Sequence, residues 1–126
     1  MGLTELLQLP HFPVMLSALI FLTLALVLVI LHKPKQWFRL HIIFASTGGI
    51  LAIIGLLILA MLILNLNHAI LGITTFSILI GTLIIGSIAV KTKIKNVRLT
   101  HIWVSRVVYI LTIVTVVLGI SFFFIT

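Results

Sequence analysis

Four long apolar runs dominate this sequence, and each has the length of a helix that crosses a membrane. They cover approximately residues 12–31, 41–64, 68–90 and 99–125. A helix needs about 20 apolar residues to span a hydrocarbon core roughly 30 Å thick. Only 7% of the residues are charged, which is far below the share in a soluble domain. The runs therefore predict an all-α membrane protein.

The connections between the runs are short, and this predicts how the helices follow one another. Short connections favour an up-down four-helix transmembrane bundle, here a single transmembrane domain over residues 1–126. Strands are disfavoured, because an open sheet leaves edge amides unpaired in lipid and a closed barrel needs alternating polar residues. The first run is expected to stay in the mature protein, because it is too long for a signal peptide and is preceded by Glu5.

The basic residues predict the orientation of the chain in the membrane. Seven of the eight lie in the two connections at residues 32–40 and 91–98, and the eighth is Arg106. By the positive-inside rule these two connections are cytoplasmic and both termini lie outside, in a plasma (cell) membrane. The net charge of +7 is thus explained by topology and contact with membrane lipids, so no nucleic-acid partner is expected.

Four of the five histidines stand at the beginnings of the four predicted helices: His11, His41, His68 and His101. A single histidine there is usually an interfacial residue, which is our interpretation of the fifth, His32. The four are different, because small residues follow them along one helix face. These faces are Ala45, Gly48, Ala52 and Gly55 after His41; Gly72, Thr75, Thr82 and Gly86 after His68; Ser105, Thr112, Thr115 and Gly119 after His101; and, more loosely, Ala18 and Ala25 after His11. Such faces permit close helix packing or leave room for a flat group.

In an up-down bundle, alternate helices are diagonal neighbours. With adjacent axes 8 to 10 Å apart, diagonal axes lie at roughly 11 to 14 Å, about what two imidazoles and an intervening metal require. We therefore expect His11 to pair with His68 near the outer surface, and His41 with His101 near the cytoplasmic surface.

The chemistry of these pairs points to haem iron. Two imidazoles alone make a poor zinc or nickel site, whereas haem supplies the four missing ligands. The chain has no cysteine, so the haem is not attached through Cys. Two haem b groups with both axial positions filled indicate electron transfer. Arg106 pairs with a haem propionate or snorkels to the interface.

The segments HFPVML, KQWFRLHIIFASTGG, NHAILGITTF and LTHIWVSRVVYILTIVTVVLGI together resemble the core of the cytochrome b561 family, in its ferric-reductase and sugar-binding-domain-linked branches. The resemblance covers nearly the whole chain. It implies two haems b, ligated by His11 with His68 and by His41 with His101. Many family members have six helices, and Ser105 replaces a common glycine, so we expect a quinol or a redox partner subunit as the electron donor in place of ascorbate.

Two other functions are compatible with the sequence. The chain could be a cofactor-free membrane subunit that scaffolds or assembles a larger oxidase or oxygenase complex. It could also be a small transporter or channel, although the apolar runs contain no acidic residue to bind an ion. Both as an electron carrier and as a scaffold subunit, the chain is expected to be part of a hetero- or homo-oligomer.

Overall fold

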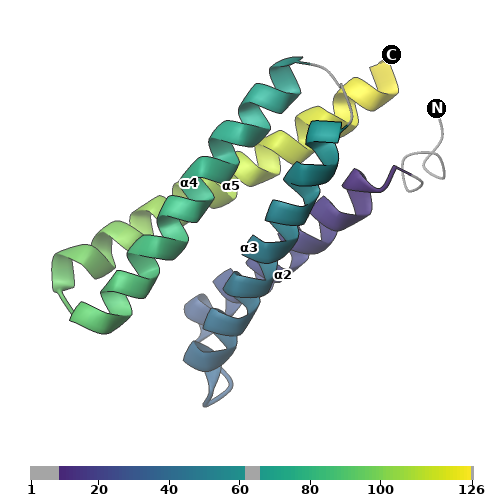
Figure 1. Cartoon of the computed structure of the whole chain (residues 1–126). Helices are drawn as coiled ribbons and strands as arrows, with labels where there is room; N and C mark the ends of the chain where they lie inside the picture. Colours follow the sequence, from purple (N-terminus) through teal and green to yellow (C-terminus); the bar gives the residue numbers. More distant parts are fainter. Residues whose placement is uncertain (1–8, 62–65, 126) are drawn as a thin grey trace. The chain divides into compact units, whose positions relative to one another are not determined.

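The structure is a computed structural model that describes residues 9–61 and 66–125. It contains α2 (His11–Leu31), α3 (Trp37–Met61), α4 (Leu66–Thr92) and α5 (Lys95–Ile125), and no strand in the described ranges (Figure 1). All four helices are long and apolar enough to cross a membrane, with mean hydropathies between 2.1 and 3.1. The predicted all-α, four-helix transmembrane class is confirmed.

The helices extend further toward the basic connections than the sequence suggested. α3 begins at Trp37 and α5 at Lys95, so Arg39 and Arg98 lie on helices and the connections shrink to residues 32–36 and 93–94. His32 and Lys93 end the preceding helices with φ values of 52° and 56°. Their backbone N–H groups donate to Leu28 and Ala89, which satisfies carbonyls at the helix ends. The predicted end of the second helix at residue 64 lies outside the described residues.

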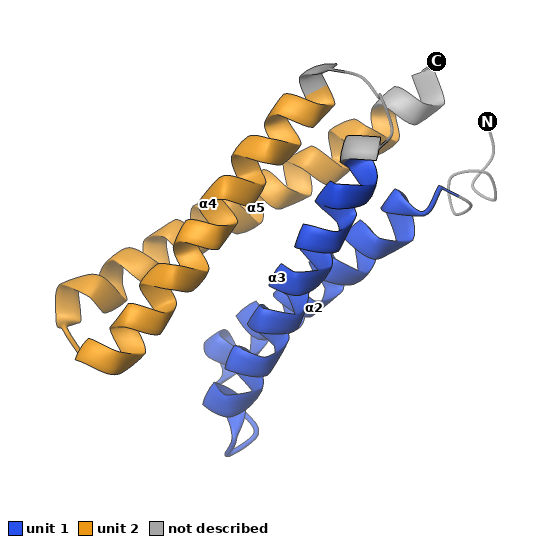
Figure 2. Ribbon diagram, in the orientation of Figure 1, with its two compact units in different colours: residues 1–63, 123–126 blue, residues 64–122 orange. Residues whose placement is uncertain are grey.

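The chain forms two compact units, each an antiparallel helical hairpin (Figure 2). The first is built on α2 and α3, and the second on α4 and α5. Each is described here by itself, and the single domain over residues 1–126 stays a prediction.

Small residues form the contact between α2 and α3 in the first hairpin. Ala18, Ala25 and Ala52 are only 2% to 4% exposed. A Cβ added to Gly48 would lie 2.9 Å from Leu22 Cγ and 3.2 Å from the Ala18 carbonyl oxygen. The two helices are therefore as close as the absence of a side chain permits.

Threonines take the corresponding place in the second hairpin. Thr75, Thr82, Thr112 and Thr115 are buried, and the Thr75 and Thr115 hydroxyls lie 3.1 Å apart, so they bond across the contact between α4 and α5. Thr82, Thr112 and Thr115 also donate to carbonyls one turn earlier in their own helices. The hydroxyls are therefore satisfied without water, as a chain in lipid requires.

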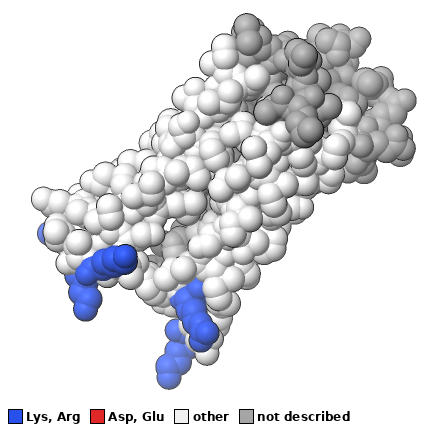
Figure 3. Space-filling view, viewed as in Figure 1, with Lys and Arg blue, Asp and Glu red and all other residues white. Residues whose placement is uncertain are grey.

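The outer faces of the helices are apolar. Large aliphatic residues such as Ile20, Leu57, Ile84 and Ile110 are 51% to 62% exposed, as expected for contact with membrane lipids. The Lys and Arg side chains in view in Figure 3 gather at the loop end of each hairpin. Apolar sides and a basic loop end give each hairpin the polarity of a membrane-spanning unit.

Candidate cofactor-binding histidines

In the first hairpin, each of the two predicted ligand histidines reaches the opposite helix. His11, in the first turn of α2, has its Nδ1 2.8 Å from the Gly55 carbonyl oxygen in α3. His41, in the second turn of α3, has its Nδ1 3.0 Å from the Ala25 carbonyl oxygen in α2. Both rings are partly buried. The two acceptors, Gly55 and Ala25, are small residues of the predicted faces.

The second hairpin repeats this arrangement. His101 Nδ1 lies 3.1 Å from the Thr82 carbonyl oxygen, and the ring covers Gly86, where an added Cβ would lie 2.7 Å from Cε1. Gly86 is one turn after Thr82, so its missing side chain uncovers the carbonyl that His101 reaches. The His68 ring covers Gly119 of α5 in the same way, with 2.7 Å from an added Cβ to Cε1.

One spacing relates the hydrogen bonds of the two hairpins. Each acceptor lies fourteen residues after the histidine of its own helix: Ala25 after His11, Gly55 after His41, and Thr82 after His68. Fourteen residues are close to four helical turns, so a histidine and the acceptor on its helix share one face. That face contacts the neighbouring helix both at the histidine and at the acceptor. This explains why the two hairpins hold their rings alike.

The hydrogen bonds show which nitrogen of each ring carries a proton. A carbonyl oxygen only accepts, so Nδ1 carries the proton in His11, His41 and His101. In the neutral ring the lone pair is then on Nε2, the nitrogen that a metal would take. Metal-bound histidines commonly donate their other N–H to a carbonyl in this way, which orients the ring and raises its basicity.

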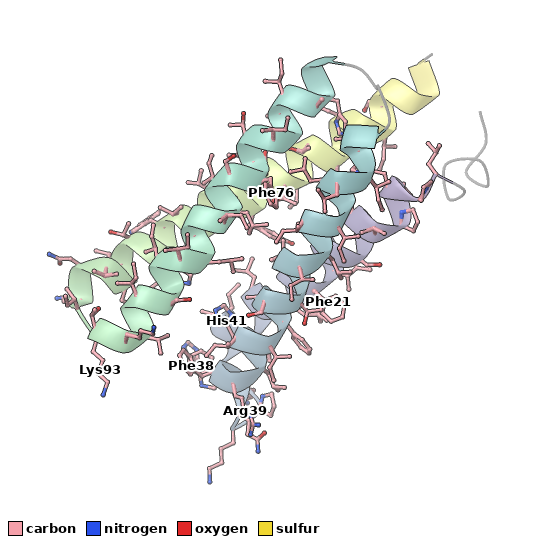
Figure 4. The ribbon with its side chains drawn as sticks, in the orientation of Figure 1. Phe21, Phe38, Arg39, His41, Phe76 and Lys93 are labelled. Carbon is pink, nitrogen blue, oxygen red and sulfur yellow. The ribbon has the colours of Figure 1, made fainter. Side chains whose placement is uncertain are left out.

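Each hairpin places its two candidate ligand histidines at opposite ends of the span. In the first hairpin, His41 lies near the loop end, close to Phe38 and Arg39 (Figure 4), and His11 lies at the other end of α2. Gly55, which accepts from His11, is fourteen residues along α3 from His41, and at 1.5 Å per residue the two levels are about 21 Å apart. The same separation relates His68 to Thr82, the acceptor for His101.

The predicted pairs, His11 with His68 and His41 with His101, each take one histidine from each hairpin, so they stay predictions. Within the described residues, no three His, Cys, Asp or Glu side chains gather to hold a metal ion.

The remaining candidate residues lie outside this arrangement. His32 is exposed and packs edge-on against Trp37, with ring centroids 4.6 Å apart, as an interfacial residue would. Arg106 is exposed, and its guanidinium carbon lies 5.1 Å from the centre of the Trp103 ring. It is five residues, about 140° around α5, from His101. This position fits the snorkelling alternative, and the propionate contact stays a prediction.

The backbone acceptors are the part of the site that sequence reasoning missed. The small-residue faces contained Ala25, Gly55, Thr82, Gly86 and Gly119, but we interpreted them only as close packing or as room for a flat group. The fourteen-residue spacing from each histidine to a small or hydroxyl residue was present in the sequence and could have indicated the acceptors.

Comparisons of the chain with known protein families, curated proteins and solved structures gave no match. The resemblance to the cytochrome b561 family therefore stays a prediction.

Proposed function

We propose that this chain carries electrons across a plasma membrane through two bis-histidine haem b groups, as a cytochrome b561-like subunit of a respiratory or reductase complex. His11 and His68 hold the outer haem, and His41 and His101 hold the inner one. The observation that carries the proposal is the hydrogen bond from histidine Nδ1 to a backbone carbonyl, made by three of the four rings.

The fit of the four histidines to haem iron rests on three features of the hairpins. The Nδ1 bonds leave the lone pair on Nε2, as an axial ligand requires. Gly86 and Gly119 give the His101 and His68 rings a bare backbone to lie against, which restricts their rotation. Gly72, one turn after His68, has no described atom within 4 Å of an added Cβ, so a group held by His68 would meet no side chain at this glycine.

The spacing of the two levels supports transfer across a membrane. A haem held by two of these histidines would supply a one-electron couple. The protein would supply axial ligands at two levels about 21 Å apart, each near one end of a hydrocarbon core roughly 30 Å thick. Histidines at one level alone would leave most of the hydrocarbon thickness uncrossed by electron transfer.

The orientation and partners follow from the charge distribution. The basic connections face the cytoplasm and both termini face outward, because Lys and Arg are retained on the cytoplasmic side. The electron donor is a quinol or a redox partner subunit. Because the basic connections are only a few residues long, the chain makes contact with such a subunit largely within the membrane.

Optical spectra of the purified chain test this proposal. We expect the oxidised and dithionite-reduced protein to show low-spin haem b absorption. H68A should remove the outer haem and H101A the inner one, because each loses an axial ligand. H32A is the matched control, since His32 is exposed and outside both sites, and it should leave the spectrum unchanged. Haem-supplemented protein without Soret absorption would refute the proposal.

The same hydrogen bonds also favour a second function, a cofactor-free subunit that scaffolds a larger oxidase or oxygenase complex. Here His11, His41 and His101 would act as clamps that join the helices of each hairpin. This function predicts that H101Q, which keeps a donor near the Thr82 carbonyl, preserves both assembly and activity of the complex. Electron transfer through haem predicts that H101Q assembles but loses the inner haem.

A further inference from the structure

A face of α5 that points away from the histidines carries cations at regular intervals. It consists of Lys95, Arg98, Leu99, Ile102, Trp103 and Arg106, which recur three or four residues apart, and we call it the α5 cationic face. Helical periodicity puts these residues on one side of the helix, and His101 on another. Apart from the predicted contact of Arg106 with a haem propionate, the face has no part in the proposed haem sites.

This face has both a polar and an apolar part. Lys95, Arg98, Leu99 and Ile102 line an open cleft of about 230 Å³. Lys95 and Arg98 are exposed at its rim, at the loop end of the hairpin. Leu99, which is 50% exposed, and Ile102 provide the apolar wall. A phosphate beside the two cations would thus have hydrocarbon surface directly beneath it.

Arg106 and Trp103 continue the face into the span. Arg106 is eight residues after Arg98, so its Cα lies about 12 Å deeper. Its guanidinium turns back over Trp103, which is 58% exposed, and this cation–π contact holds the charge on the side of the basic end. The chain's only acidic side chain is Glu5, so the charge of this face calls for an anion from outside the chain.

We propose that the α5 cationic face binds an anionic phospholipid. The headgroup phosphate lies between Lys95 and Arg98, the ester region lies near Arg106, and one acyl chain runs along Leu99 and Ile102. Free phosphate would match the two outer cations only, whereas a phospholipid matches the cations and the apolar wall together. The inference requires that α5 spans a bilayer, and it is independent of haem.

Quenching of Trp103 by phospholipids with brominated acyl chains tests this site in the full chain. The background is W37F, because Trp37 is the only other tryptophan. In phosphatidylcholine nanodiscs containing phosphatidylglycerol, we expect stronger quenching when the anionic lipid carries the bromine. Each cation near the surface should enrich anionic lipid on the order of fivefold. Equal quenching by both brominated lipids would overturn the proposal.

Two variants locate the effect. K95Q/R98Q should make the two brominated lipids quench equally, because it removes the phosphate contacts. K33Q/K35Q removes the same charge from the other hairpin and should keep the difference in quenching between the two lipids. If both double variants abolish the difference in quenching equally, the anionic lipid is attracted by the overall charge of the chain and the site is refuted. If inorganic phosphate abolishes it while chloride of equal ionic strength does not, the ligand is free phosphate, and the phospholipid site is also refuted.

Native mass spectrometry provides a second measurement that needs no change at Trp37. We expect the parent protein and K33Q/K35Q to retain anionic phospholipid after detergent extraction, and K95Q/R98Q to lose it. Retention by K95Q/R98Q equal to that of the parent would overturn the proposal. Circular dichroism of each variant verifies that its helices are intact.

Discussion

The imidazole of His101 occupies the space that a side chain on Gly86 would need: an added Cβ would lie 2.7 Å from the ring's Cε1 and 3.0 Å from its Nδ1. The glycine thereby lets His101 reach the Thr82 carbonyl one turn earlier in α4. Residues that ligate nothing themselves thus fix the direction of a candidate ligand.

G86A should displace the His101 ring and weaken binding of the inner haem. Loss of a group that orients a metal ligand typically costs 10- to 100-fold in affinity, and haem titration of the purified apoprotein measures it. G81A is the control in the same helix, because an added Cβ at Gly81 meets no described atom within 4 Å. It should leave haem affinity unchanged. Equal affinities for both variants would contradict the positioning role of Gly86.

G72L tests whether the outer haem lies beside Gly72. Gly72 lies one turn after His68, and the space around it is open to an added Cβ. If a haem lies there, leucine should lower haem content by roughly tenfold or more, a cost of at least about 1.4 kcal/mol. G81L is the matched control, since Gly81 is equally open but lies off the histidine face. Full haem content in G72L would place the haem elsewhere.

T75V should destabilise the second hairpin through the loss of its bond to Thr115. Hydrogen bonds between membrane helices contribute about 0.6 kcal/mol on average and up to about 1.7 kcal/mol. Reversible unfolding in mixed micelles measures the change in the free energy of unfolding. T74V is the control, because Thr74 is exposed and bonds only within its own helix. A double-mutant cycle with T115V should give a coupling of the same size, and zero coupling would refute the bond.

Single-cysteine labelling tests the proposed orientation, because the natural chain has no cysteine. In intact cells, K35C and N96C should be protected from a membrane-impermeant maleimide, because both lie at the basic ends. P10C, at the exposed start of α2, should react. Permeabilisation controls for accessibility by making all three react. Labelling of K35C in sealed cells would reverse the orientation.

The sequence predicted the helices well because apolar length is a local property. The helix ends were predicted less accurately. Arg39 and Arg98 were assigned to connections, yet they lie in the first turns of α3 and α5, since exposed basic residues are compatible with a first helical turn. The small-residue faces predicted which side of each helix contacts the other helix of its hairpin. They could not show that His101 bonds the Thr82 backbone, because a carbonyl acceptor has no residue-type signature and becomes available only when the neighbouring helix is in register.

The number of haem b groups per chain tests the central claim most directly. A pyridine haemochrome assay of the purified parent protein, normalised to protein by amino-acid analysis, should give two haems per chain. H41A/H101A should lower that number to one, because the outer pair remains. A parent protein without haem, or a haem content that the histidine variants leave unchanged, would contradict the account.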